Sequence, residues 1–185
     1  MEERLKKLSR TMAYALRHHP ESFGLTLDDQ GWVPVDELLA ALHQQSSWQG
    51  VSSDDLAAVI AQSDKQRYEM RGGLIRAFYG HSIPQKMTRE PATPPAMLFH
   101  GTTQEAVRAI KVEGLKPMRR QYVHLSAEEA STRMVALRRT THPVILRVNA
   151  FQAHQQGIQF YYGNDSTWLA EPIPPRFIHF VTQEG

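Results

Sequence analysis

The chain has 185 residues, of which 41% are hydrophobic and 22% are charged, a composition typical of a globular protein with one large or two small domains. It contains no cysteine, which excludes a disulfide framework, a thiolate zinc site and a cysteine nucleophile. No apolar run approaches the roughly 18 residues of a membrane span, and the first residues lack the apolar core of a signal peptide. We therefore expect a cytoplasmic protein that does not bind membranes.

The charge is distributed unevenly, although the net charge is only +2. Residues 1–84 contain nine basic and eleven acidic side chains, a net charge of −2, whereas residues 85–185 contain twelve and eight, a net charge of +4. Neither half has the strong basic stripe of a protein that binds nucleic acid without sequence preference. Any recognition of phosphate must therefore depend on a few well-placed arginines.

The first half begins with a helix. Apolar residues at helical spacing predict an amphipathic helix over residues 4–19, which Pro20 ends. Two short strands are predicted next, over residues 25–27 and 32–35, on either side of the turn sequence at 28–31.

Two further helices and a hairpin complete the first half. Acidic residues favour the start of a helix over residues 36–42, and the capping-box spacing of Ser52 and Asp55 marks a third helix. Residues 67–78 place two strand-like stretches around a glycine turn, which indicates a β-hairpin. Three helices followed by a hairpin is the order of a winged helix, a fold that binds nucleic acid or protein. We therefore expect residues 1–84 to form a winged-helix lobe.

A proline-rich segment separates the two halves. Residues 85–96 contain three prolines and few apolar side chains, which predicts an inter-domain linker. The remaining residues, 97–185, contain many short strands and few helices, which predicts a lobe built on a mixed or antiparallel sheet. The strands are expected at 97–99, 122–125, 143–148, 159–162, 167–169 and 177–181. The whole chain is thus assigned to the α+β class, with two lobes.

Two positions in the second half repeat one arrangement, in which a strand ends near a histidine and a hydroxyl residue caps the next helix. Thr102 with Glu105, and Ser126 with Glu129, have capping-box spacing, and the second helix is expected to run to Arg138. The free N–H groups of a helix N-terminus, beside a glycine or a hydroxyl, suit the ribose and phosphates of a nucleotide. The alternative is that both positions are only turns with caps. The nucleotide-binding candidates are His100, Gly101, Thr102, His124, Leu125 and Ser126.

Several common catalytic sites are not indicated. The nine histidines do not fall into a metal-ligand spacing and no carboxylate cluster accompanies them, so no metal site is expected. The chain lacks the G-x-S-x-G motif of a serine hydrolase and the glycine-rich motifs that bind ATP or, in a Rossmann fold, NAD. Serine-hydrolase activity, ATP binding and Rossmann-type NAD binding therefore have no support in the sequence.

Cationic side chains recur at the ends of the predicted elements. Arg17 and His18 end the first helix, Arg76 lies in the hairpin, and Arg138 ends the helix after Ser126. Each alone is compatible with a surface charge, and a helix C-terminus favours cations in any case. Together they would make a pocket for a phosphate dianion, because guanidinium groups bind phosphate oxygens in bidentate fashion.

Seven short motifs occur in a characteristic order along the chain. They are Leu-Arg-His-x-Pro (16–20), Asp-x-x-Gly-Trp-Val (28–33), Ile-Arg-Ala-x-x-Gly-His-Ser (75–82), Leu-Phe-His-Gly-Thr (98–102), Tyr-Val-His-Leu-Ser (122–126), Pro-Val-Ile-Leu (143–146), and a late Trp-Leu (168–169) with Pro-Pro (174–175). In order and spacing they resemble the KptA-type RNA 2′-phosphotransferase family. The resemblance covers essentially the whole chain.

This resemblance implies an enzyme with two lobes: a winged-helix lobe that presents RNA and an ADP-ribosyltransferase-like lobe that binds NAD⁺ as co-substrate, without a metal. Members of the family remove an internal 2′-phosphate from RNA in two steps. The phosphate first attacks the nicotinamide ribose and expels nicotinamide, and the ribose 2″-hydroxyl then attacks the phosphorus. The products are 2′-OH RNA and ADP-ribose 1″,2″-cyclic phosphate. The expected partner is an RNA with a 2′-phosphate, such as a tRNA; no protein partner is indicated, so we expect a monomer.

The resemblance also implies residue roles. Arg17, His18 and Arg76 would grip the transferring phosphate, and Arg138 would stabilise charge in the second step. The six strand-end candidates named above would contact the ADP-ribose and the nicotinamide ribose. The loop residues expected to contact RNA are Gly80, His81 and Ser82.

Three departures from the family pattern and two alternative functions remain open. Tyr79 stands where the family often has glutamine and could add a ring that stacks on RNA. The loop after Arg138 is longer than usual, and the turn sequence at 164–168 differs from the typical one. One alternative keeps the fold but stops after the first step, as an ADP-ribosyltransferase that modifies phosphorylated RNA or DNA ends. The other is a non-catalytic winged-helix RNA-binding protein.

Overall fold

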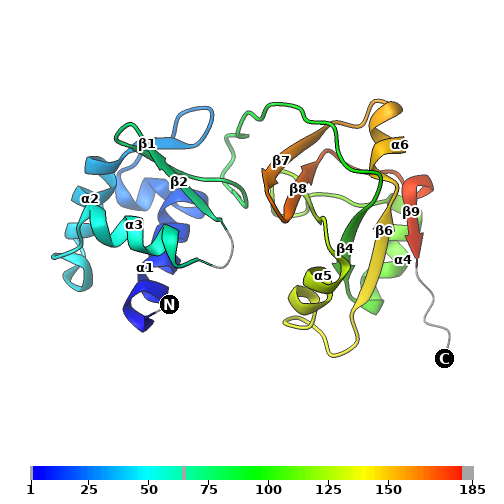
Figure 1. Cartoon of the computed structure of the whole chain (residues 1–185), viewed down its shortest axis with the longest axis horizontal. Coiled ribbons are helices and arrows are strands. Elements are labelled where there is room, and N and C mark those ends of the chain that lie inside the picture. The colour runs from blue at the N-terminus through cyan, green and yellow to red at the C-terminus, as the bar shows by residue number, and fades with distance from the viewer. Residues whose placement is uncertain (1, 64–65, 181–185) are drawn as a thin grey trace. The chain divides into compact units, whose positions relative to one another are not determined.

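The computed structural model describes residues 2–63 and 66–180, and the chain divides into two compact units, residues 1–89 and 90–185. Figure 1 shows the elements of both units, coloured in chain order. The division falls inside the proline-rich segment 85–96.

Both ends of the proline-rich segment 85–96 pack against the unit to which they belong. Met87 is fully buried in the first unit, and the Thr88 N–H donates to the Asp29 carbonyl oxygen at 2.7 Å. In the second unit, the Ala92 N–H donates to the Phe160 carbonyl oxygen at 2.8 Å. Residues on both sides of the division are therefore held by main-chain hydrogen bonds, unlike those of a freely extended linker.

The first unit combines three α-helices with a three-stranded antiparallel sheet in its described residues, in the order β1-β3-β2. Its elements are α1 (Glu3–Ala13), the π-helical turn η1 (Tyr14–His18), the 3₁₀ turn η2 (Pro20–Phe23), β1 (Trp32–Pro34), α2 (Val35–His43), the 3₁₀ turn η3 (Ser46–Trp48), α3 (Ser53–Ala61), β2 (Tyr68–Arg71) and β3 (Leu74–Ala77). The predicted helices, the strand at 32–35 and the hairpin are therefore confirmed to within a few residues.

The strand predicted at 25–27 is wrong. Leu25 and Leu27 are buried, but the segment forms no strand. The chain instead enters a turn, in which the Asp28 carboxylate accepts hydrogen bonds from the N–H groups of Gln30 and Trp32, both at 2.8 Å. The apolar alternation therefore reflected burial and not sheet pairing.

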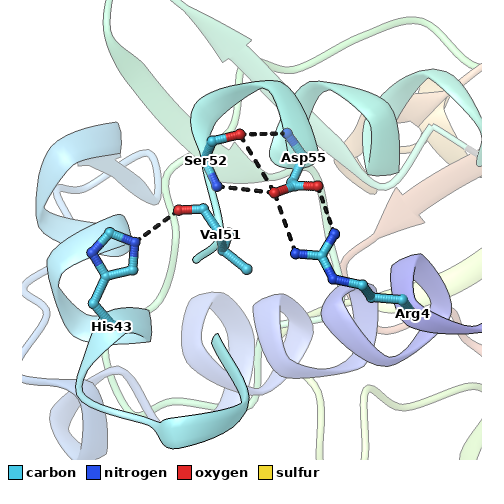
Figure 2. Close-up of polar contacts among 5 residues, drawn as sticks. All are labelled: Arg4, His43, Val51, Ser52 and Asp55. Carbon is cyan, nitrogen blue, oxygen red and sulfur yellow. Dashed lines mark hydrogen bonds and ion pairs between the residues drawn. The ribbon is translucent and has the colours of Figure 1, made fainter. Parts of the chain in front are cut away.

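The three helices of the first unit are tied together around the start of α3 (Figure 2). The predicted capping box is confirmed: Ser52 Oγ accepts from the Asp55 N–H at 3.4 Å, and Asp55 Oδ2 accepts from the Ser52 N–H at 3.0 Å. Arg4 on α1 donates to the other carboxylate oxygen at 2.8 Å, and this bond lowers the pKa of Asp55. His43, at the end of α2, donates its Nε2–H to the Val51 carbonyl oxygen at 2.7 Å. Each helix thus has a polar contact with this short segment.

The second unit contains a six-stranded sheet in the order β7-β8-β5-β4-β6-β9. Its elements are β4 (Leu98–Thr102), α4 (Gln104–Glu113), β5 (Val123–Ser126), α5 (Glu129–Ala136), β6 (Val144–Val148), α6 (Ala150–Gln155), β7 (Phe160–Asn164), β8 (Thr167–Ala170), the 3₁₀ turn η4 (Pro175–Phe177) and β9 (Ile178–Phe180). All six predicted strands are present; residue 181, at the end of the last one, lies outside the described residues.

The second unit decides between the two sheet types expected from the sequence and has one additional helix, α6. Every neighbouring pair of described strands is antiparallel, so of the two sheet types expected for this lobe the antiparallel sheet is present and the mixed sheet is not. No connection here is a crossover between adjacent parallel strands, which a mixed sheet would require. The short helix α6 was not predicted, because its six residues are too few for a periodic pattern.

The caps predicted in the second unit are wrong by one or two residues. Thr102 is the last residue of β4, and Thr103 Oγ1 accepts from the Ala106 N–H at 3.4 Å to cap α4. Ser126 ends β5, and its hydroxyl accepts from the Glu128 N–H at 3.2 Å in a local turn before α5. Both hydroxyl residues predicted to cap helices therefore end strands.

Replacement of Ser52 by alanine should lower the free energy of unfolding by about 1 kcal/mol, because the Asp55 N–H loses its acceptor. Ser53→Ala is the matched control, since Ser53 is exposed at the first position of α3, and it should change stability by less than about 0.5 kcal/mol. Urea unfolding followed by circular dichroism measures both variants. Equal stabilities would contradict the role of the cap.

Candidate functional site

The first predicted motif lies on an unusual helical turn. In η1 the His19 N–H donates to the Tyr14 carbonyl oxygen, five residues earlier, at 2.9 Å. Pro20 follows and cannot continue the helix, because it has no N–H to donate. This turn carries Arg17 and His18 at the C-terminal end of the helix, where the helix dipole favours cations. Such π-helical turns are frequent at functional sites.

Arg17 is held between two tyrosine rings. Its guanidinium carbon lies 5.3 Å from the Tyr68 ring centroid and 5.5 Å from that of Tyr79, and its Nη2 donates to the Arg67 carbonyl oxygen at 3.3 Å. Burial lowers the pKa of Arg17 from its usual value of 12.5. Its Nε is buried and has no hydrogen-bond acceptor among the described residues. The first unit therefore contains a largely desolvated cation, which an anion would stabilise.

The loop after β3 fixes both cations of the motif. Gly80 has a φ of 91°, which favours glycine, and a Cβ there would lie 3.5 Å from Arg17 Nη1. The Ser82 N–H donates to the Arg17 carbonyl oxygen at 2.9 Å, and the Ser82 hydroxyl bonds to His18 Nδ1 at 2.8 Å. Gly80 and Ser82, which the sequence predicted to contact RNA, thus lie against Arg17 and His18, where Ser82 orients the imidazole.

His81, the remaining residue of this loop, is a buried neutral ring with only 2% of its surface exposed. Burial and then the charges of Arg89 and Arg17 lower its pKa from 6.5 to about 3. Its Nε2 has no hydrogen-bond partner among the described residues and would lie 3.3 Å from a Cβ at Gly31. The side chain predicted to contact RNA is therefore packed inside the first unit.

Arg76 lies on β3 between an acidic and an aromatic side chain. Its Nε donates to Glu69 Oε2 at 2.9 Å, and its Nη2 lies 2.8 Å from the same oxygen. The guanidinium carbon lies 4.4 Å from the Trp32 ring centroid and 5.7 Å from that of Phe78. Arg76 is therefore ordered by its neighbours and does not extend freely into solvent.

Three of the four predicted catalytic residues gather in the first unit. Arg17, His18 and Arg76, together with Arg89, all act electrostatically on His81 and lower its pKa. We call these four residues the cation cluster. Two or more guanidinium groups around one point are suited to hold a phosphate dianion.

The fourth predicted catalytic residue, Arg138, belongs to the second unit. Helix α5 ends at Ala136, two residues earlier than predicted, and the Arg138 N–H donates to the Val135 carbonyl oxygen at 3.3 Å. Arg138 is exposed. It therefore lies in the turn after the helix and not in the last helical turn.

The two predicted histidines of the second unit are linked through the main chain. His100 Nδ1 donates to the His124 carbonyl oxygen at 2.9 Å, and His124 Nδ1 donates to the Tyr122 carbonyl oxygen at 3.0 Å. Burial lowers the pKa of His100, which favours its neutral form. In that form a ring with a proton on Nδ1 has Nε2 as an acceptor, which suits a ribose hydroxyl.

Gly101, the fourth residue of β4, packs against helix α5. A Cβ at Gly101 would lie 2.7 Å from Ala136 Cβ and 3.2 Å from the Thr132 carbonyl oxygen, both on α5. The close approach that the sequence predicted at this glycine is therefore made by a helix. Leu125 is buried in the core of the second unit, whereas Thr102 is partly exposed at the end of β4.

Two kinds of feature are absent from residues 2–63 and 66–180. None of the helices there combines the length and the apolar character that a membrane crossing requires. No three side chains of histidine, cysteine, aspartate or glutamate there are grouped so that they could hold a metal ion.

Comparison with known proteins decides the family. The model of the RNA 2′-phosphotransferase, Tpt1 / KptA family matches residues 3–172. The chain belongs to this family. A probable RNA 2′-phosphotransferase of Acetivibrio thermocellus is 51% identical over 174 residues, which cover 94% of this chain and 96% of the relative. A protein with the same description from Bacillus thuringiensis is 46% identical, over 92% of this chain and 92% of the relative. Another, from Lacticaseibacillus paracasei, is 44% identical, over 98% of this chain and 96% of the relative. The resemblance seen in the motifs is confirmed.

The sequence analysis missed the residues that hold the family's arginines in place. Tyr68 and Tyr79 flank Arg17, and for Tyr79 the sequence had suggested only that its ring could stack on RNA. Glu69 binds Arg76, and the glycine turn of the hairpin was the signal that could have found it. With two glycines at the centre, residues at equal distance from the turn face each other, which pairs Glu69 with Arg76.

The first unit should lose stability as the pH falls from about 6.5 toward 3. The pKa of His81 is about 3 in the folded protein, below the ordinary value of 6.5 that applies to the unfolded chain. The unfolded state therefore binds this proton more readily, and acid favours unfolding by at most about 1.4 kcal/mol per pH unit for this group.

Urea unfolding of the wild type and of His81→Gln between pH 4.5 and 7.5 measures this dependence. The wild type should lose stability more steeply with acid than His81→Gln does. His19→Gln, which replaces an exposed histidine of the same unit, should have a smaller effect on the slope. Identical slopes for the wild type and His81→Gln would refute the prediction.

Proposed function

We propose that the protein is an NAD⁺-dependent enzyme that transfers an internal 2′-phosphate of RNA to NAD⁺. The products would be 2′-OH RNA, nicotinamide and ADP-ribose 1″,2″-cyclic phosphate. The observation that carries this proposal is that hydrogen bonds and ring contacts hold Arg17, His18 and Arg76 in place in a chain of this family. Fixed cations of this kind stabilise a phosphate and the charge that develops on it during transfer.

We assign RNA to the first unit and NAD⁺ to the second. The three helices and the antiparallel hairpin of the first unit are the elements of a winged helix, which supports residues 1–84 as the RNA-presenting lobe. Residues 97–185 would be the ADP-ribosyltransferase-like lobe, with 85–96 connecting the two. The substrate would be an RNA with a 2′-phosphate, such as a tRNA, and the enzyme would act as a cytoplasmic monomer.

In the first step, an oxygen of the RNA 2′-phosphate would form a bond to the anomeric carbon of the nicotinamide ribose. The bond from that carbon to the nicotinamide nitrogen breaks, and its electron pair leaves with nicotinamide. No base is needed, because the phosphate is already an anion. Arg17, His18 and Arg76 would orient the attacking oxygen. His100 would accept a hydrogen bond from a ribose hydroxyl, which its Nδ1-protonated neutral ring permits.

In the second step, the ribose 2″-hydroxyl would attack the phosphorus and lose its proton, while the bond from phosphorus to the RNA 2′-oxygen breaks and that oxygen gains a proton. Negative charge accumulates on the phosphate oxygens, where guanidinium groups provide electrostatic stabilisation without a metal. We assign this role to Arg138. The partly exposed residues Thr102, His124 and Ser126 are proposed to contact the ADP-ribose.

Incubation with NAD⁺ and an RNA that carries one internal 2′-phosphate should release nicotinamide and yield 2′-OH RNA with ADP-ribose 1″,2″-cyclic phosphate. Mass spectrometry of the RNA and chromatography of the small molecules measure the products. The yield should be unchanged by EDTA, because the guanidinium groups perform the role of a metal. An ADP-ribosylated RNA as the final product would favour an end-modifying ADP-ribosyltransferase, and no nicotinamide release would favour a non-catalytic RNA-binding protein.

Arg138→Ala should slow the second step by about 100-fold or more and allow ADP-ribosylated RNA to accumulate, because a cation that stabilises developing charge is lost. Arg133→Ala is the matched control, since Arg133 is a cation of α5, the helix that precedes Arg138, and its described ion pair is with Glu129. Single-turnover assays that resolve the RNA species give both rates. If Arg138→Ala slows the two steps equally, the assigned role is wrong.

A further inference from the structure

We propose that Glu69 is a positioning residue, which holds the guanidinium of Arg76 in the orientation that the transferring phosphate requires. This inference rests on the proposed function, in which Arg76 grips that phosphate. Glu69 lies outside the seven motifs that carry the family resemblance.

Glu69, Arg76 and Trp32 form one row across the three strands of the first unit. The β2–β3 register places Glu69 opposite Arg76, and the β1–β3 register places Trp32 opposite Arg76. Residues directly opposite each other in an antiparallel sheet share a face, with Cβ atoms about 4.5–5.5 Å apart. Strand pairing therefore places one neighbour on each side of Arg76.

The two neighbours restrain different parts of the guanidinium group. Glu69 Oε2 accepts from Nε at 2.9 Å and lies 2.8 Å from Nη2, so one carboxylate oxygen occupies one edge of the group. The Trp32 ring packs against its face, with the guanidinium carbon 4.4 Å from the ring centroid. Nη1 has no acceptor among the described residues, which leaves this end of Arg76 to phosphate oxygens.

The carboxylate does not remove the positive charge of this region. Arg71 Nε lies 3.8 Å from Glu69 Oε1, so each carboxylate oxygen faces a different guanidinium. The three side chains together carry a net charge of +1. Arg76 is only 16% exposed, whereas Arg71 is 68% exposed, so the ordered partner of Glu69 is Arg76.

A carboxylate beside an arginine could instead compete with phosphate for the guanidinium. The geometry favours positioning, because Glu69 uses the edge formed by Nε and Nη2 and leaves Nη1 to a ligand. A long arginine side chain that is already ordered loses less conformational entropy when it binds an anion. Since a displacement of about 1 Å from the reactive geometry can lower a rate by about 100-fold, orientation should matter more than the added negative charge.

The test compares Glu69→Ala, Glu69→Gln, Arg76→Ala and the double variant of Glu69→Ala with Arg76→Ala in the 2′-phosphate transfer assay. Glu69→Ala should lower kcat by about 10- to 100-fold, because Arg76 loses its orientation. Glu69→Gln should retain kcat to within about fivefold, because an amide oxygen can accept from the same two N–H groups. In the Arg76→Ala background, Glu69→Ala should have no further effect, because Glu69 acts through Arg76.

Arg4→Gln is the matched control. It removes the ion pair with Asp55 in the same unit but leaves the capping box of α3, so it should lower stability slightly and leave kcat unchanged. Thermal unfolding of every variant separates a loss of activity from a loss of folded protein.

Three results would overturn the proposal. A wild-type kcat for Glu69→Ala excludes positioning. A lower KM for RNA with unchanged kcat, in both Glu69 variants, identifies the carboxylate as a competitor of phosphate. Additive effects of Glu69→Ala and Arg76→Ala assign Glu69 to the structure of the unit alone. Inactivity of the wild-type protein would instead refute the proposed function, so the two failures are distinguishable.

Discussion

The proposed phosphate site of the first unit depends on one guanidinium group, that of Arg17, which is largely buried. Removing a charge from water costs several kcal/mol unless the protein replaces its hydration. At Arg17 the replacement consists of two tyrosine rings and the carbonyl oxygen of Arg67, and Nε has no acceptor among the described residues. These groups replace the lost hydration of Arg17 only in part. Because the cation loses most of its hydration when the protein folds, little further desolvation is needed when an anion binds. An anion therefore gains more from this cation than from an exposed arginine.

The partners of Arg17 come from distant parts of the chain, so the cation cluster exists only when the unit has folded. Arg67 and Tyr68 belong to the start of the hairpin, and Tyr79 and Ser82 follow it. Ser82 binds the carbonyl oxygen of Arg17 and the ring of its neighbour at once, which fixes the last helical turn against the loop. A mutation that destabilises the hairpin should consequently also disturb the positions of Arg17 and His18 at the end of the first helix.

Several local patterns were predicted correctly from the sequence, whereas most contacts between distant residues were not predicted. The helix end at Pro20 and the capping box at Ser52 depend on residues a few positions apart, and both are confirmed. The cap at Thr102 was misplaced because Thr103 is also a hydroxyl residue, and only the length of β4 decides between them. The rings that flank Arg17 lie about 50 to 60 residues away from it, so no spacing rule predicts them. The family motifs supplied the arginines and Trp32, which packs against Arg76, but not Tyr68 or Glu69.

Aromatic rings order Arg17 and Arg76 without using their hydrogen-bond donors. Arg17 packs against Tyr68 and Tyr79, and Arg76 packs against Trp32. A carboxylate would bind N–H groups that phosphate also needs, whereas a ring binds the flat face and leaves the edges available. Stacking of this kind uses the planar face of a guanidinium, so lysine is not an equivalent replacement for either residue even though its charge is the same. The aromatic residues therefore set the choice of arginine in this site, and Glu69 completes the arrangement by fixing the single edge that the rings cannot.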